Sequence, residues 1–97
     1  MEYTRILRLV KCLDLLDNNL TGKIPWDIES LKALIILNVS RNHFSGEIPK
    51  SLGSMVRLES LDLSINEFGG MFPIEMIYLT YLSYFDVSHN KISGVIP

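Results

Sequence analysis

The residues best equipped for chemistry stand close together near the C-terminus, where Asp86, Ser88 and His89 fall within four positions. A carboxylate, a hydroxyl and an imidazole are the groups of a hydrolytic triad, which must lie within hydrogen-bonding reach of one another. Neighbouring residues of one strand instead point to alternate faces, and Asp62 and Ser64 repeat the same pair earlier in the chain. We therefore interpret them as parts of a structural repeat, and we predict no catalytic residues and no enzyme activity.

The other reactive side chains are too sparse for a metal or cofactor site. One cysteine and two histidines exclude an internal disulfide and a cysteine-rich zinc site. Gly69 and Gly70 form a pair without the Lys-Ser/Thr of a phosphate-binding loop. We predict no metal and no cofactor. Cys12 is either a free thiol or one half of an intermolecular disulfide.

Composition and charge narrow the classes of partner. The chain has 97 residues, enough for one domain, and its hydrophobic share of 47% supports a packed core. A net charge of −2 gives no basis for binding nucleic acid or an anionic membrane, which attract clustered positive charge. The longest apolar run, residues 33–37, is far below the roughly 20 residues that span a bilayer. We therefore expect no nucleic acid partner and no membrane-spanning segment in this chain.

A regular 24-residue period organises the sequence. Prolines, glycines and asparagines each recur four times at this spacing, as Pro25, Pro49, Pro73 and Pro97, as Gly22, Gly46, Gly70 and Gly94, and as Asn18, Asn42, Asn66 and Asn90. Seven further columns hold only apolar residues, among them Leu13/Leu37/Leu61/Phe85 and Leu15/Val39/Leu63/Val87. Self-similarity of this kind is typical of repeat architectures in which each unit packs on its neighbours.

Each unit predicts a short strand, a turn and an extended return. Leu37-Asn38-Val39 alternates apolar, polar and apolar residues, the period of a strand with one buried face. The proline in every unit excludes pairs of long helices, because proline lacks the N–H that a helix interior requires. We expect strands at 13–15, 37–39, 61–63 and 85–87 to stack in parallel. The four asparagines should hydrogen-bond backbone groups where each coil bends, forming a ladder along the stack.

The unit resembles the leucine-rich repeat, Leu-x-x-Leu-x-x-Leu-x-Leu-x-x-Asn-x-Leu, whose period is about 20–29 residues. Residues 31–44 match this motif, and Ser45-Gly46-Glu47-Ile48-Pro49 is similar to the plant-specific subclass. The third unit departs from it, with Gly69 for Ser/Thr and Phe72 for Ile. The resemblance implies a leucine-rich-repeat solenoid, an α/β-type right-handed superhelix. It would place one short parallel strand per 24-residue repeat on the concave face and extended or 3-10 segments on the convex side.

The resemblance also implies how the chain is organised and where it comes from. It implies one array over 1–97, with units at 7–30, 31–54 and 55–78, an incomplete unit at 79–97, and a remnant of a preceding segment at 1–6. The opening of the chain, residues 2–11, looks like the segment that restarts the array in plant receptor-like proteins. The chain would then be the C-terminal, membrane-proximal block of a receptor-like protein or receptor-like kinase ectodomain. The parent would lie in the plasma membrane with this block outside the cell.

The ends of the array carry none of the polar caps that solenoids need. The sequence also shows no signal peptide and no spanning helix. We therefore expect a fragment or a degenerate product of a larger array, with apolar side chains open at both ends.

The expected function is binding of a protein or peptide ligand, and of a co-receptor kinase ectodomain, in signalling or defence. Candidate contacts on the concave face are Asp14, Asp17, Asn38, Arg41, Asp62, Tyr84, Asp86 and His89. Asn19 and Asn38 each begin an Asn-x-Ser/Thr glycosylation acceptor, and a glycan on Asn38 would cover part of that face. Two alternatives stay open: a truncated structural relic without binding activity, and a soluble inhibitor or decoy.

Overall fold

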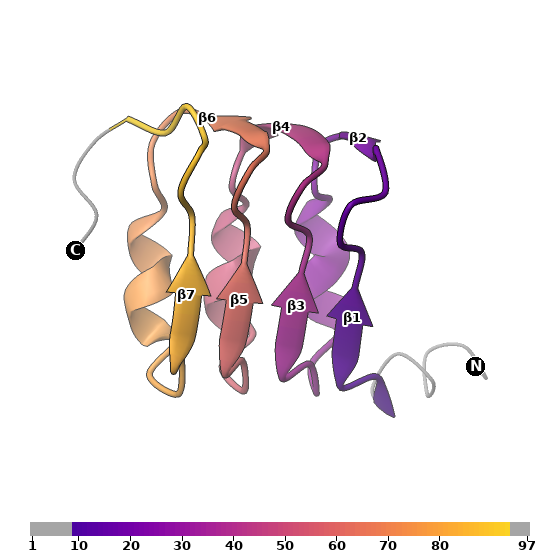
Figure 1. Ribbon diagram of the computed structural model, residues 1–97. Helices are drawn as coiled ribbons and strands as arrows, with labels where there is room; N and C mark the ends of the chain where they lie inside the picture. The colour runs from indigo at the N-terminus through magenta and orange to yellow at the C-terminus, as the bar shows by residue number, and fades with distance from the viewer. Residues whose placement is uncertain (1–8, 94–97) are drawn as a thin grey trace.

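The computed structural model of the protein describes residues 9–93, which form successive coils stacked side by side (Figure 1). The first strands of the coils form a parallel sheet in the order β1-β3-β5-β7. Leu13 pairs with Leu37, Leu37 with Leu61, and Leu61 with Phe85, so neighbouring strands are one full period of the sequence apart. The strands are β1 (Cys12–Asp14), β3 (Ile36–Asn38), β5 (Ser60–Asp62) and β7 (Tyr84–Asp86). This confirms the parallel stack, whereas the expected segment 1–6 and the last proline, Pro97, lie outside the described residues.

Each strand begins and ends one residue earlier than the alternation of apolar residues predicts. The reason lies in the acidic or amide residue at the end of the strand, as in β5, where Asp62 Oδ1 accepts a hydrogen bond from the backbone N–H of Ser64 at 3.0 Å. Such a local turn bends the chain out of the regular strand after Asp62. The backbone N–H of Leu63 still reaches the next coil, donating to the carbonyl of Asp86 at 2.8 Å.

A second, three-stranded parallel sheet runs along one edge of the stack, and the sequence reasoning missed it. Its strands are β2 (Thr21–Gly22), β4 (His43–Glu47) and β6 (Glu67–Gly69). The signal was present in the sequence, since an extended segment that recurs in every coil must meet its own copies. In this sheet Ser45 lies opposite Glu67 and not opposite Gly69, the residue equivalent to Ser45 one period later. The strands of the second sheet are therefore paired in a different register from those of the first sheet, where equivalent residues lie opposite one another.

The opposite side of each coil is a short 3-10 helix, which confirms the expected 3-10 segments. These helices are η1 (Trp26–Ser30), η2 (Lys50–Ser54) and η3 (Ile74–Tyr78). Each follows a proline in extended conformation, because proline starts a helix well but has no N–H to continue one. In the second coil, the carbonyl of Pro49 accepts the N–H of Leu52 at 3.1 Å. None of the helices in residues 9–93 is long and apolar enough to cross a membrane.

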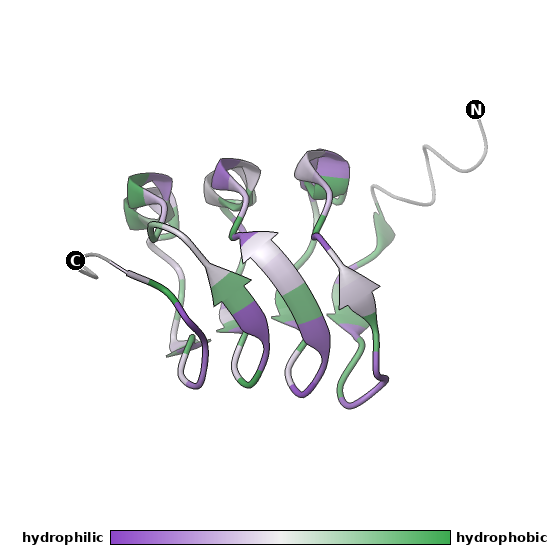
Figure 2. Ribbon diagram, turned by 90° about the horizontal axis from the view of Figure 1, so that it is seen from above, coloured by the Kyte–Doolittle hydropathy of each residue, from purple (hydrophilic) through white to green (hydrophobic). Residues whose placement is uncertain are grey.

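The core lies between the first sheet and the 3-10 helices and is made by the apolar columns. Figure 2 looks at the coils from above, with the 3-10 helices along one side and hydrophobic segments alternating with hydrophilic ones along the strands. The central coils are fully packed: Leu37, Leu61 and Phe68 have no exposed surface. Phe44 and Phe68 stack with ring centroids 6.3 Å apart. The side chains of the outer coils, such as Leu13, are only half-buried because one neighbouring coil covers them.

Candidate functional site

The outward side of the first sheet carries a column of acidic and amide side chains. In every strand the middle residue points into the core, so the residues on either side of it point outward. The register aligns the last outward residues with one another, and the first outward residues with one another. We call these outward residues the strand face: Cys12, Asp14, Ile36, Asn38, Ser60, Asp62, Tyr84 and Asp86. Five of the eight predicted contact residues belong to the strand face: Asp14, Asn38, Asp62, Tyr84 and Asp86. A sixth, His89, lies in the turn that follows β7.

The carboxylates of this column are fixed by hydrogen bonds to the residues that follow them. Asp62 Oδ1 accepts from the hydroxyl of Ser64 at 2.6 Å, and Asp86 Oδ1 accepts from the hydroxyl of Ser88 at 2.6 Å. The backbone N–H of Ser88 donates to the same oxygen at 2.9 Å. These bonds favour the ionised form of Asp86 and lower its pKa below the ordinary value of 3.8. The bond from the hydroxyl has the larger effect, and the bond from the N–H has the smaller one. One oxygen of each carboxylate, Oδ1 of Asp14, Asp62 and Asp86, is therefore held by the turn that follows it.

Tyr84 lies beside this acidic column. Its hydroxyl donates to Asp62 Oδ2 over a long distance of 3.4 Å. The negative charge of Asp62 raises the pKa of Tyr84 above its ordinary value of 10.0, with a smaller contribution from Asp86. Tyr84 therefore stays a neutral hydrogen-bond donor at physiological pH, and its side chain is 49% exposed.

The turn that follows each strand of the first sheet holds a second column, in a backbone conformation that the sequence did not indicate. Its members are Asp17, Arg41, Ile65 and His89, with φ between 55° and 57°. Residues other than glycine rarely adopt this left-handed conformation, although Asn, Asp and His do so more often than the rest. Ile65, which is branched at Cβ, is the least suited to it. A sequence signal would have been Gly or Asn at these positions. We call these four residues the turn column, and all four are exposed.

The structure pairs the C-terminal Asp-Ser-His group differently from a triad. The hydroxyl of Ser88 donates to Asp86, and no hydrogen bond within residues 9–93 joins His89 to either residue. The other histidine, His43, lies 3.1 Å from Glu67 Oε2 on the edge formed by β4 and β6. No group of three or more His, Cys, Asp or Glu side chains in the described part of the chain is arranged to hold a metal ion.

The predicted asparagines lie beneath the turn column and connect neighbouring coils. Asn42 Nδ2 donates to the carbonyls of Leu15 at 2.8 Å and Val39 at 2.9 Å, and Asn42 Oδ1 accepts the N–H of Leu20 at 2.9 Å. Asn66 and Asn90 repeat this pattern one and two coils further on. Asn18, in the first described coil, is exposed, and within residues 9–93 its side chain donates only to the carbonyl of Leu16, at 3.0 Å. Its backbone N–H donates to Asn42 Oδ1 at 3.0 Å.

Two predicted modification positions and the cysteine lie at accessible places. Asn19 is exposed and adopts a φ of 55°. Asn38 is half-buried on the strand face, where its Oδ1 accepts the N–H and the hydroxyl of Ser40. Cys12 is an exposed free thiol on β1. A glycan on Asn38 would stand in the middle of the strand face, so glycosylation there remains a prediction with a direct consequence for binding.

Comparisons with known proteins agree with this geometry. The family model described as Leucine Rich Repeat matches residues 9–31, 33–55 and 81–97. No curated protein matches the sequence. Among solved structures, a chain of the BIR3–SERK2 complex from Arabidopsis thaliana is 34% identical, with a TM-score of 0.91 over 100% of this chain and 52% of that one.

Two other solved structures differ in what their proteins do. The Arabidopsis receptor kinase HAESA, in complex with the peptide hormone IDA and the co-receptor SERK1, is 42% identical with a TM-score of 0.87, over 97% of this chain and 16% of that one. A plant ice-binding protein is 32% identical with a TM-score of 0.87, over 97% of this chain and 31% of that one. The chain spans about half or less of the length of these similar chains.

Proposed function

The chain belongs to the leucine-rich-repeat family, and on that premise we propose that it is a protein- or peptide-binding module that contacts its partner through the strand face and the turn column. The observation that carries this proposal is the acidic column, in which each carboxylate is held by its own turn. Side chains fixed before binding lose little conformational entropy on binding, which favours a contact role.

The partner that fits this surface has hydrogen-bond donors or positive charges opposite the column. The outward oxygens of Asp14, Asp62 and Asp86 accept hydrogen bonds but cannot donate them when ionised. An extended peptide laid across the strands, which lie about 4.8 Å apart, would present backbone N–H groups and basic side chains to the column. Tyr84 and Arg41 add an aromatic ring and a guanidinium, the side chains that most often dominate binding energy.

The turn column gives independent support. A left-handed backbone costs roughly 1–2 kcal/mol for an ordinary L-residue, and glycine would avoid that cost. Asp17, Arg41, Ile65 and His89 keep full side chains there and differ from one another in charge and polarity. The cost is greatest for Arg41 and Ile65, and exposed side chains that are costly for the fold are expected where their identity serves recognition.

The similar proteins support a finer proposal. HAESA is described with a peptide hormone and a co-receptor, and it shares 42% identity with this chain. We propose that the chain is part of a longer plant receptor ectodomain on the outside of the plasma membrane. There it would contact a peptide ligand and a co-receptor kinase ectodomain.

Binding of the SERK1 ectodomain to the 97-residue chain tests this proposal. The double variant Arg41→Ala/Tyr84→Ala should weaken binding at least tenfold, about 1.4 kcal/mol, because two exposed contact side chains are removed. The matched control is Trp26→Ala/Lys50→Ala, which removes two exposed side chains from the 3-10 helices and should leave affinity unchanged. Equal affinities of both double variants would place the interface elsewhere, and no binding by any variant would favour the structural relic.

A further inference from the structure

The third coil carries a stripe of exposed apolar and aromatic side chains along η3. Its members are Met71, Ile74, Tyr78 and Tyr81, which are 69%, 67%, 62% and 69% exposed. The stripe runs from the segment after β6, along η3, to the turn before β7. The 3-10 helices lie on the side of the coils opposite the first sheet (Figure 1). We call these four residues the outer stripe.

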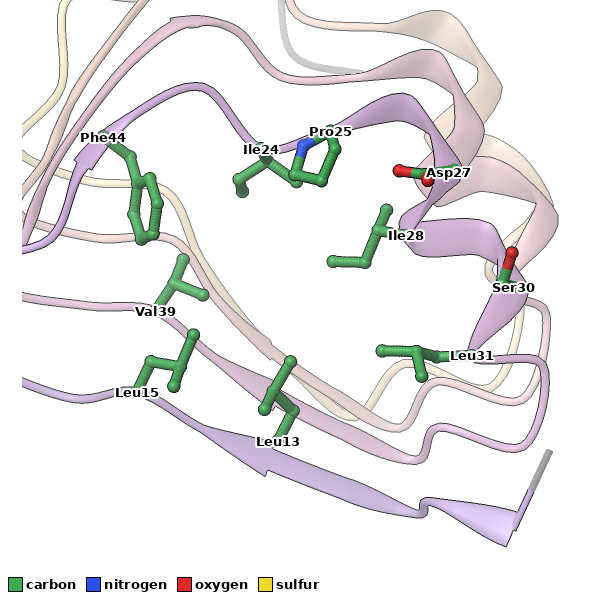
Figure 3. Close-up of a pocket in the computed structure, with 10 residues that line it drawn as sticks. All are labelled: Leu13, Leu15, Ile24, Pro25, Asp27, Ile28, Ser30, Leu31, Val39 and Phe44. Carbon is green, nitrogen blue, oxygen red and sulfur yellow. The ribbon is translucent and has the colours of Figure 1, made fainter. Parts of the chain in front are cut away.

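The core does not require apolar residues at these four positions. Figure 3 shows Ile28 and Leu31 of the first coil pointing into the coil, toward Leu13 on the strand side. Their equivalents in the third coil, Met76 and Leu79, are buried. Inward residues in and after η3 therefore already supply the core, and the outer stripe lies outside it.

The exposure of the outer stripe is a property of its positions in the coil. The equivalent residues of the second coil, which has a neighbouring coil on each side, are all exposed: Glu47, Lys50, Ser54 and Arg57. The outer stripe would therefore stay exposed with a further coil beside it. Ile77 is different, because its equivalent, Gly53, is buried against η3, and Ile77 is not part of the stripe. The second coil has polar residues at these four positions, whereas the third coil has apolar and aromatic ones.

The outer stripe is large enough to form the centre of an interface. An aromatic side chain has about 150–250 Å² of surface, so the four exposed side chains present on the order of 500 Å². The largest apolar patch on a typical monomeric protein is about 300–600 Å², and such patches are often functional. A standard interface buries about 800 Å² on each partner. The stripe would provide more than half of that area, and the second coil beside it would provide the rest.

The order of residues along the outer stripe is complementary to its own reverse. Ile74 and Tyr78 each lie two residues from Met76, the middle of η3, and Met71 and Tyr81 each lie five residues from it. A two-fold axis that crosses the stripe at the middle of η3 therefore brings Ile74 of one copy against Tyr78 of the other. The same axis brings Met71 of one copy against Tyr81 of the other. Each aliphatic side chain then meets an aromatic ring, and the sulfur of methionine packs favourably on such rings.

The charges of the second coil fit the same axis. Glu47 and Arg57 lie five residues before and five residues after the middle of η2, so the axis sets Glu47 of one copy opposite Arg57 of the other. Within residues 9–93 neither side chain forms an ion pair. The Glu47 side chain lies against Gly70 of the third coil, next to the outer stripe. Lys50 comes opposite Ser54, which is neutral, so the axis brings no like charges of this coil together.

We propose that two copies of this chain form a closed dimer through the outer stripe, with a two-fold axis that runs parallel to the stack of coils. The same surface of both copies forms the interface, so the assembly ends at two chains. The stacks of the two copies run in the same direction, and both ends of each stack stay free for further coils. The strand faces point away from each other, so this proposal does not depend on what the strand face binds.

Charge reversal and analytical ultracentrifugation test the dimer. The unmodified chain should approach the mass of two chains as its concentration rises. Glu47→Arg sets arginines opposite one another, and Arg57→Glu sets glutamates opposite one another, so each variant alone should dimerise at least tenfold more weakly. In an equal mixture the introduced charges face each other and so do the unchanged ones, which should restore the two-chain species. Glu59→Arg makes the same change in charge at an exposed position before β5 and is the matched control.

A second pair of variants tests the apolar part of the interface. Tyr78→Ser gives the third coil the residue that the second coil has at the equivalent position, Ser54, so the fold should be kept while the dimer is lost. Tyr84→Ser makes the same substitution on the strand face and should leave the dimer intact. Far-UV circular dichroism checks that both variants are folded.

The outcomes separate the dimer from its rivals. An unmodified chain that stays monomeric at every concentration measured would overturn the proposal, as would a mass that rises beyond two chains. A mixture of the two charge variants that stays monomeric would contradict the proposed axis. If the chain is monomeric and Tyr78→Ser weakens its binding to the SERK1 ectodomain, the outer stripe contacts a different protein and not a second copy. Recovery of the two-chain species in the mixture supports the proposal and shows that both charge variants are folded.

Discussion

The carbonyl oxygen of Val39 joins Asn42 to Asn66. It accepts a hydrogen bond from Asn42 Nδ2 at 2.9 Å, within its own coil, and another from Asn66 Nδ2 at 3.0 Å, from the next coil. The carbonyl of Leu63 is shared in the same way by Asn66 at 3.3 Å and Asn90 at 2.9 Å. Asn42, Asn66 and Asn90 thus each bond the bend of their own coil and fasten it to the preceding coil.

Asn42→Ala should lower the free energy of unfolding by about 1–3 kcal/mol, because buried N–H and carbonyl groups of two coils lose their partners. Asn18→Ala is the matched control, since Asn18 is exposed and makes one side-chain bond, and its effect should be much smaller. Urea unfolding at one fixed protein concentration measures both. Equal effects of the two substitutions would contradict the role assigned to the ladder.

Gly53→Ala should destabilise the protein because η2 and η3 approach each other closely at this glycine. A methyl group on Gly53 would lie 2.5 Å from the carbonyl oxygen of Glu75, a backbone atom that cannot move without moving η3. We expect a loss of about 1–3 kcal/mol in the free energy of unfolding. Gly69→Ala, where the nearest atom would be 3.9 Å away, should be close to neutral in the same urea titration. A tolerated Gly53→Ala would mean that the 3-10 helices can separate freely.

Ile65→Gly should raise the melting temperature, because it removes a β-branched residue from a φ of 55°. The gain is expected to be about 1 kcal/mol. Ile36 has the same exposure, 41%, but lies in β3. Ile36→Gly should therefore lower the stability by about 0.5–1 kcal/mol, since glycine weakens a strand. Thermal unfolding measures the melting temperature of both variants. A change in melting temperature of the same sign in both would exclude backbone strain at Ile65.

Ser88→Ala should raise the pKa of Asp86 toward its ordinary value of 3.8, because the hydroxyl is the strongest of the groups that stabilise the carboxylate. A lowered pKa in the folded state means that ionised Asp86 contributes stability that is complete above pH 3.8 and is lost as the pH falls through the lowered value. NMR titration of the side-chain carboxyl carbon measures the shift. Ser83→Ala, whose hydroxyl binds the carbonyl of Glu59, should leave the titration of Asp86 unchanged.

The regular period made most of the fold predictable, because a repeated coil can bury its apolar face only against another copy of itself. Leu37, Leu61 and Leu63 fall in columns that the sequence places in the core, and the structure buries them. The second sheet and the exact ends of the strands were not predicted, because both depend on hydrogen bonds. The strand ends depend on side-chain bonds such as that of Asp62, and the second ladder on backbone bonds between extended segments.

The candidate site was predictable in its members but not in their conformation. The outward positions of Asp62, Tyr84 and Asp86 follow from the alternation of side chains along a strand. That Ser88 would bind Asp86 rather than His89 depends on the turn after β7, which positions Ser88 beneath the carboxylate and His89 at a positive φ.

The sequence by itself determined the class of fold, the parallel register and the asparagine columns, since all of these are set by spacing along the chain. Only the tertiary structure decided how the coils join. The close approach of η3 to Gly53 and the carbonyl of Val39 that two asparagines share arise between coils, where atoms remote in sequence meet at distances that a one-dimensional period does not contain.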